Sequence, residues 1–229
     1  RTYQEVRGAR VALGFKNLDP NGITISSPTN SHQQSSAVAY TGKDFMVVWE
    51  DWRNAVTTKV DIYGARVGVN GVVLDKTGIP VSTASGNQGA PSVASDGKDA
   101  LVVWNDLRGG TAATAIYSTR VSGSGVVLDK VGVMLSGAQY INQAAAVAWG
   151  GGAYQVVQAV NKSAGGGNDI RGERLNSVGQ LTTGNFLVNA GSSGTRMQAT
   201  VAAGGSGFLA AWTDYRVAVG NIYITRVIP

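Results

Sequence analysis

A twelve-residue block that occurs four times constrains the fold of this 229-residue chain more than any other feature. Its first copy, residues 42–53, reads Gly-Lys-Asp-Phe-Met-Val-Val-Trp-Glu-Asp-Trp-Arg. The copies begin at Gly42, Gly97, Gly151 and Gly205. One position of the block is held by Trp49, Trp104, Gln158 and Trp212, at separations of 55, 54 and 54 residues. Repetition at a fixed period indicates an architecture built from one repeated structural unit.

Three further segments recur with the same period, so each unit holds four short strand candidates. One opens with a glutamine followed by small residues, at Gln34, Gln88, Gln143 and Gln198. A second has the pattern of residues 61–67 and recurs at 115–121, 169–175, 221–227 and 5–11. A third reads Leu-Asp-x-x-Gly-Ile at residues 74–79 and recurs at 128–133, 18–23 and, loosely, 181–186. We expect the glutamines on the innermost strands, lining a central channel.

The hydrophobic pattern predicts strands and essentially no helix, because no segment keeps an apolar period of 3.6 residues. The repeated block is apolar on both alternating faces, with Phe45, Val47 and Trp49 on one and Met46 and Val48 on the other. Such a strand is buried on both sides. We therefore predict an all-β protein, a β-propeller with four blades of four antiparallel strands. It would be a single domain over residues 1–229, with units at about 5–60, 61–114, 115–168 and 169–229.

The two ends of the chain are expected to close the propeller by pairing their strands. The chain begins and ends part-way through a unit, so the N-terminal Asp-x-x-Gly-Ile strand would complete the last blade. The strand from Glu5 to Val11 is then in surplus. Three alternatives stay open: a fifth outermost strand, a chain cut from a longer array, or self-association through an unpaired edge.

The repeats also resemble a known group of proteins. Residues 47–54, with Trp-x-Asp-x-Arg, followed by Asp-Ile-Tyr at residues 61–63, resemble the repeats of secreted bacterial β-propeller proteins, related in pattern to TolB-type repeats. The resemblance covers nearly the whole chain. It implies extracellular or periplasmic binding and scaffolding roles without shared catalytic residues. The third unit departs from the pattern at Gln158, Val160 and Lys162, which argues against a strictly four-fold site.

The Trp-x-Asp-x-Arg motif is the strongest candidate for ligand binding. Residues two apart in a strand face the same way, so the three side chains of each copy share one face. An aromatic ring beside a carboxylate and a guanidinium suits a sugar-binding subsite. The candidate residues are Trp49, Asp51, Arg53, Trp104, Asp106, Arg108, Trp212, Asp214 and Arg216. The alternative is structural: tryptophan packs between blades and aspartate pairs with arginine, as expected for a motif that stacks repeats.

The composition excludes several kinds of chemistry. Cysteine is absent, which excludes disulfides, thiol catalysis and Cys-type zinc sites. The only histidine is His32, and the only glutamates are Glu5, Glu50 and Glu173. We therefore predict no catalytic residues, no metal and no cofactor. No apolar run is long enough to span a membrane, so no membrane insertion is expected.

The net charge of +5 does not by itself indicate a nucleic-acid partner, because the basic residues form no continuous stripe. Eight of the 19 lie at fixed repeat positions, namely Arg10, Arg66, Arg120, Arg174 and Arg226 together with Arg53, Arg108 and Arg216. We expect these to pair with Asp51, Asp106, Asp214 or their neighbours.

The sequence thus predicts a secreted, non-catalytic module with several weak binding sites for a carbohydrate or cell-surface glycoconjugate, similar to a lectin. The first alternative is a surface or filament-forming scaffold that assembles through residues 5–11. The second is a glycosidase or lyase on a propeller scaffold.

Overall fold

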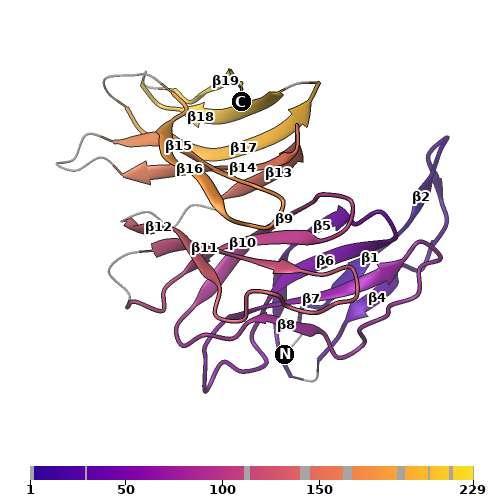
Figure 1. Ribbon diagram of the computed structural model, residues 1–229. Helices are drawn as coiled ribbons and strands as arrows, with labels where there is room; N and C mark the ends of the chain where they lie inside the picture. Colours follow the sequence, from indigo (N-terminus) through magenta and orange to yellow (C-terminus); the bar gives the residue numbers. More distant parts are fainter. Residues whose placement is uncertain are drawn as a thin grey trace.

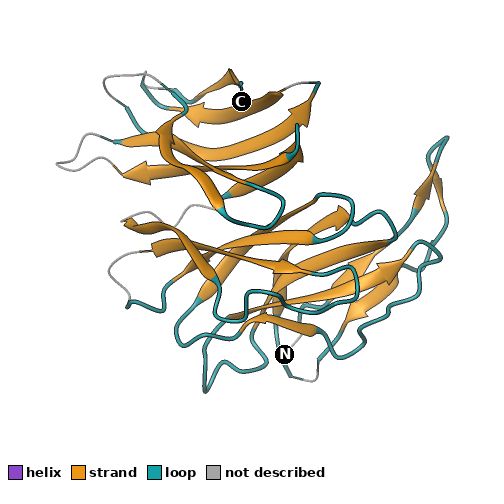
Figure 2. Cartoon of the chain, viewed as in Figure 1, coloured by secondary structure: helices purple, strands orange, loops and turns teal. Residues whose placement is uncertain are grey.

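The computed structural model describes residues 3–28, 30–110, 114–139, 145–161, 167–189, 194–205, 207–216 and 219–228, with the side chains of residues 138 and 139 excepted. Every regular element among these residues is a strand, and none is a helix (Figure 2). The all-β prediction is confirmed for this part of the chain. Gln143 and Lys162 lie outside the described residues.

Three four-stranded antiparallel sheets form the middle of the chain. The first sheet contains β5 (Gln33–Tyr40), β6 (Asp44–Asp51), β7 (Asp61–Gly68) and β8 (Ile79–Ser82). The second contains β9 (Gln88–Ser95), β10 (Ala100–Asp106), β11 (Thr114–Val121) and β12 (Val133–Gln139). The third contains β13 (Ala146–Gly150), β14 (Ala153–Asn161), β15 (Asn168–Leu175) and β16 (Leu181–Leu187).

Smaller sheets lie at the two ends. The N-terminal sheet pairs β1 (Val6–Gly8) with β4 (Ile23–Ser26), and β2 (Val11–Ala12) with β3 (Lys16–Asn17) forms a hairpin between them. The C-terminal sheet contains β17 (Arg196–Gly204), β18 (Gly207–Asp214) and β19 (Asn221–Val227). Figure 1 shows these two sheets at opposite ends of the array.

The expected closure by N- and C-terminal strands is not formed. The strand expected to complete the last blade, β4, pairs instead with β1. Among the described residues no sheet combines strands from the two ends of the chain. The strand expected in surplus at Glu5 to Val11 contains β1, which forms a separate two-stranded sheet with β4. This sheet packs on the first four-stranded sheet. The physical reason is local: β1 and β4 are close along the chain and are connected through the β2–β3 hairpin, so they pair without a strand from the other end.

Each sheet packs one face on the opposite face of the next. Met46 and Val48 of β6 pack with Val102 and Trp104 of β10. Corresponding apolar clusters join the second sheet to the third and the third to the C-terminal sheet. Middle strands therefore have apolar neighbours on both sides, which confirms the interpretation of their two apolar faces.

The sheets begin at the innermost strand, so their limits differ from the predicted repeat units. They span residues 33–82, 88–139, 146–187 and 196–227, whereas the predicted boundaries fall between the second and third strands. The equivalence of the glutamines is also wrong. Gln34 lies opposite Glu50, while Gln88 lies opposite Asp106 and is matched in the first sheet by Gln33.

The misalignment of the glutamines comes from their spacing, because Gln34 and Gln88 are 54 residues apart whereas Trp49 and Trp104 are 55 apart. The first strand of each of three sheets also contains a bulge at an equivalent position, where Ser35, Ala90 and Gln198 have φ of 54°, 50° and 55°. The glutamines therefore do not form a ring of equivalent side chains.

The expected pairing with Asp51, Asp106 and Asp214 is confirmed for Arg53, Arg108 and Arg216, but Arg10, Arg66 and Arg120 pair with other aspartates. Arg66 makes two side-chain hydrogen bonds to Asp75 at 2.9 Å, and the carboxylate also accepts the Arg66 backbone N–H. Arg120 pairs with Asp129 and Arg10 with Asp19 in the same way. The Arg66 guanidinium also donates to the backbone carbonyl of Gly123 in the second sheet. These pairs thus join neighbouring sheets near their outer strands.

Candidate functional site

The Trp-x-Asp-x-Arg residues form a buried cluster centred on the aspartate. In the first sheet, Asp51 accepts hydrogen bonds from Trp49 Nε1 at 2.8 Å and from Gln33 Nε2 at 2.7 Å. The Arg53 guanidinium donates to both carboxylate oxygens, and the Arg53 backbone N–H adds a further bond. Burial acts to raise the pKa of Asp51, but these hydrogen bonds outweigh it and lower the pKa. We call this arrangement the Trp-Asp-Arg cluster.

The same cluster recurs in the second and C-terminal sheets. Asp106 accepts Trp104 Nε1 at 2.8 Å and pairs with Arg108. Asp214 accepts Trp212 Nε1 at 3.3 Å and pairs with Arg216, which lowers the pKa of Asp214. In each case the guanidinium also lies over a tyrosine ring of the next strand, namely Tyr63, Tyr117 and Tyr223.

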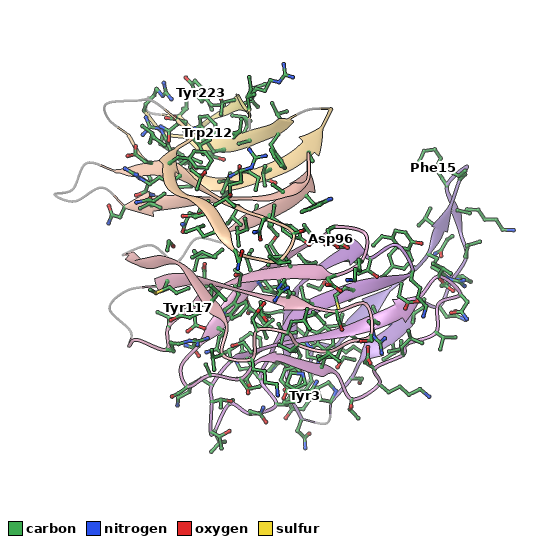
Figure 3. All side chains as sticks on the ribbon, in the orientation of Figure 1. Tyr3, Phe15, Asp96, Tyr117, Trp212 and Tyr223 are labelled. Atoms are coloured by element: carbon green, nitrogen blue, oxygen red, sulfur yellow. The ribbon has the colours of Figure 1, made fainter. Side chains whose placement is uncertain are left out.

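This geometry corrects the expected sugar-binding role of the nine motif residues. Trp49 and Trp104 have no exposed surface, and Trp212 is 5% exposed, so their rings cannot stack on a sugar. Figure 3 shows Trp212 and Tyr223 together within the C-terminal sheet. The carboxylates of Asp51, Asp106 and Asp214 are also buried and already paired. The structural alternative for Trp49, Asp51, Arg53, Trp104, Asp106, Arg108, Trp212, Asp214 and Arg216 accounts for their contacts.

The third sheet replaces this cluster by a different polar pair. Gln158 stands in place of the tryptophan and donates to Glu173 Oε1 at 2.8 Å. Glu173 is fully buried, and its Oε2 has no hydrogen-bond partner among the described residues. Burial raises the pKa of Glu173 to about 7, against the opposing hydrogen bond from Gln158. A carboxyl group in this environment changes its charge near neutral pH.

A polar pocket of about 280 Å³ lies between the first and second sheets. We call it the Glu50 pocket. Glu50 comes from the end of β6, Gln88 and Ala90 from β9, Asn105 from β10 and Thr114 from β11. Strand alternation places Glu50 on the face opposite Trp49 and Asp51, toward the second sheet. Of the four pockets described, only this one is lined by a carboxylate.

Glu50 is held in place by two hydrogen bonds. Its Oε1 accepts the backbone N–H of Ala90 at 2.6 Å, and its Oε2 accepts Gln34 Nε2 at 3.1 Å. The bulge described above presents the Ala90 N–H to the carboxylate. The orientation of the carboxylate therefore depends on the packing of two neighbouring sheets.

Two buried acceptors in the Glu50 pocket have no partner in the described part of the chain. They are Gln88 Oε1 and Asn105 Oδ1. The orientation of the Gln88 amide is fixed, because its Nε2 donates to the carbonyls of Ala84 and Gly86 at 3.0 and 2.8 Å. A buried polar atom without a partner is costly, so a ligand that donates hydrogen bonds would be stabilised here.

Metal chemistry has no support in the described residues. They contain no group of three or more His, Asp or Glu side chains that could hold a metal ion. Among the same residues, no helix is long and apolar enough to cross a membrane.

No protein-family model matches the chain, and no curated protein is similar to it in sequence. Solved structures share its fold. The Penicillium chrysogenum α-L-arabinanase complexed with arabinobiose aligns with a TM-score of 0.58 and 9% identity, covering 97% of this chain and 70% of the enzyme. The Bacteroides thetaiotaomicron endo-arabinase aligns with 0.54 and 10%, covering 93% and 82%. The GH43_1 enzyme from Xanthomonas citri complexed with xylose aligns with 0.52 and 12%, covering 87% and 75%.

At these identities the likeness establishes the fold, which is all-β and propeller-like. It also corrects the functional prediction. A lectin-like protein without catalysis was expected because no catalytic motif is visible in the sequence, yet the solved structures that share the fold are carbohydrate-active enzymes. The prediction that the chain is not an enzyme is overturned with it. The physical reason is that the function of a protein depends on particular residues at a site, which need not form a sequence motif.

Sequence reasoning did not select the Glu50 pocket. Glu50 lies between Trp49 and Asp51, at the first variable position of the Trp-x-Asp-x-Arg motif, so the motif does not select it. One signal was available: the equivalent residues of the other units are Asn105, Ala159 and Thr213. A carboxylate in only one repeat is not needed for stacking repeats, and this difference could have marked Glu50.

Proposed function

We propose that this chain is a carbohydrate-active enzyme of the glycoside hydrolase class and that the Glu50 pocket binds its substrate. The observation that carries the proposal is a pocket with an oriented carboxylate and two buried acceptors, on a fold shared with arabinan- and xylose-binding enzymes.

The chemistry of the pocket suits a polyhydroxylated ligand. Sugar hydroxyls are hydrogen-bond donors, and Gln88 Oε1 and Asn105 Oδ1 are acceptors that lack a donor. A few fixed polar groups in a concave site set the orientation of a ligand. The pentose polymers arabinan and xylan are the first substrates to test, because the solved structures with this fold act on or bind such sugars.

Glu50 supplies the reactive group in this proposal. Glycoside hydrolysis generally uses two carboxyl groups, one as general acid and the other as base or nucleophile. The Ala90 N–H and the Gln34 side-chain amide donate to the two carboxyl oxygens of Glu50, so we assign Glu50 to the base or nucleophile role. Among the described residues lining this pocket, Glu50 is the one carboxylate, and the proposal assigns it one of the two roles.

The test is hydrolysis of arabinan and xylan, measured as release of reducing ends. We expect turnover by the natural chain and loss of at least about a hundredfold in Glu50→Gln, the size of effect that removal of a proton-transfer group gives. Glu5→Gln is the matched control, because Glu5 is partly exposed and lies in the N-terminal segment outside the pocket. Retained activity in Glu50→Gln, with activity present in the natural chain, would remove Glu50 from the reaction.

The number of propeller blades is also part of the proposal. In place of four blades, we infer five blade positions, because three complete sheets are flanked by two partial ones.

The relationship to secreted propeller repeat proteins and an extracellular location stay predictions from the repeat pattern. Immunoblotting of the culture medium and cell fractions of the source organism checks the location.

A further inference from the structure

Val38 on the inner strand of the first sheet is exposed, although the same position is buried in the next two sheets. It is 60% exposed, whereas Val93 on β9 and Val147 on β13 are 8% and 7% exposed. The pairing registers establish the equivalence, since the three residues lie opposite Val47, Val102 and Val156. The first sheet therefore lacks a cover that the other sheets have.

The missing cover is a particular strand. The second sheet is covered by Met46 and Val48 of β6, and the third by Leu101 and Val103 of β10. The C-terminal sheet is covered in the same way by Val157 and Ala159 of β14. In each case the covering side chains include those of the second strand of the preceding sheet.

The first sheet is covered only by β1 and β4, through Val6 and Ile25. These strands hold the third and fourth positions of a blade, because β1 has the sequence pattern of β7 and β4 that of β8. Next to β1 there is a groove of about 440 Å³. It is lined mainly by apolar groups of β1, β5 and β6, among them Ala9, Val38 and Phe45. Of the described strands only β4 pairs with β1. At its start the Val6 N–H and the Gln4 carbonyl bond to Gln33, so the part of the edge left open toward the groove is Arg7 and Gly8.

The hairpin between β1 and β4 differs from the equivalent turns. Gly71, Gly125 and Gly179 lie against the arginines Arg10, Arg66 and Arg120 of the preceding sheet, in contact with their side chains. Phe15 stands at this position in the N-terminal hairpin and is 96% exposed at its tip (Figure 3). A phenylalanine ring leaves no room for the arginine contact. The N-terminal hairpin therefore cannot make the arginine–glycine contact that joins the other sheets. A single added strand at the edge of β1 does not need that contact.

We propose that the groove accepts an apolar β-strand from a partner polypeptide, which pairs with the open edge of β1. The strand carries the pattern of β6, with apolar residues on both faces, and its side chains cover Val38 and Phe45. Backbone hydrogen bonds to an exposed edge provide affinity in such strand addition, and alternate side chains provide specificity. The groove is continuous with the existing interface, because Ile25, Val47 and Val67 line the groove and belong to that cluster.

The test uses a labelled synthetic peptide with the sequence of residues 42–53, a soluble lysine tag, and fluorescence anisotropy with the whole chain. We expect saturable binding, absent for a scrambled peptide of the same composition. Val38→Glu places a charge in the groove and should weaken binding by roughly tenfold or more. Val131→Glu is the matched control, since Val131 is 80% exposed and does not line the groove.

Each outcome decides the proposal. Binding that Val38→Glu weakens and Val131→Glu leaves unchanged supports it. Absence of binding to the natural chain, or equal binding to both variants, overturns it. Dimers of the chain without peptide that Val38→Glu dissociates, measured by sedimentation, would assign the groove to a second copy and also overturn it. Polysaccharide hydrolysis does not enter the measurement, so failure here leaves the proposed enzymatic function untouched.

Discussion

The first and third sheets have the same four strands but stabilise their interiors in opposite ways. In the first, Asp51 is buried with donors from Trp49, Gln33 and Arg53, and its pKa is lowered. In the third, Glu173 is buried with one donor from Gln158, and its pKa is raised to about 7. The comparison shows that burial alone does not decide the charge of a carboxyl group: the number of hydrogen bonds to its charged form does.

The third sheet lacks both aspartates of the pattern, although it keeps Arg174 at the position of Arg66. Val160 stands where the aspartate is expected, and Thr183 stands nine residues after Arg174, where Asp75 follows Arg66. A partly retained cluster would leave charged groups buried without partners, at a cost of several kcal/mol. Replacement of the set is therefore less damaging than replacement of one member.

The largest expected effect tests the aspartate of the first sheet. Asp51→Ala removes the acceptor shared by an indole N–H, an amide and a guanidinium, so we expect a loss of about 4 kcal/mol in the free energy of unfolding. Val160→Ala changes the same strand position of the third sheet and should cost only roughly 1–2 kcal/mol through lost apolar contact. Urea unfolding followed by tryptophan fluorescence measures both. Equal losses would show that the two sheets do not differ in this respect.

The next effect tests the buried carboxyl of the third sheet through its pH dependence. The pKa of Glu173 rises from 4.5 to about 7 on folding, so stability is greatest below pH 4.5 and falls as the pH rises through 7. Glu173→Gln, which stays neutral, should therefore be more stable than the natural chain by about 3 kcal/mol at pH 8 and nearly equal to it at pH 4.

Unfolding free energies at the two pH values check this expectation. Glu5→Gln is the control, since Glu5 is partly exposed, and its difference from the natural chain should not follow the same curve. A constant gain for Glu173→Gln at both pH values would mean that lost repulsion or better packing, and not titration, is the cause.

The smallest effect compares the outer ion pairs. Arg66→Ala removes two hydrogen bonds to Asp75 and one to the second sheet, and should cost roughly 1–2 kcal/mol because the pair is partly exposed. Arg174→Ala, at the position that lacks the aspartate, should cost less. Thermal unfolding of both variants at low and high salt separates the ionic part, which should shrink with salt only for Arg66→Ala.

Much of the local structure follows from the sequence. The period near 54 residues, the four strands of the three middle sheets and the two apolar faces of β6, β10 and β14 are predicted correctly, because alternation along a strand is local information. The sequence also indicates correctly that the third unit differs from the others, since Gln158 and Val160 cannot form the Trp-Asp-Arg cluster. The sequence could not show that the cluster faces the interior. Strand alternation shows which side chains share one face of a strand, but it does not show what packs against that face.

The tertiary structure decided the rest. The bulge at Ala90 interrupts strand alternation and presents a backbone N–H to Glu50 of the neighbouring sheet. The pairing of β4 with β1 replaces the expected closure and opens the groove beside Val38. Arg10, Arg66 and Arg120 meet Asp19, Asp75 and Asp129 only because each outer hairpin folds back on its own strand. These features depend on which strands and faces meet. Because the repeats have similar strands and faces, the sequence pattern alone does not determine which of them pack together.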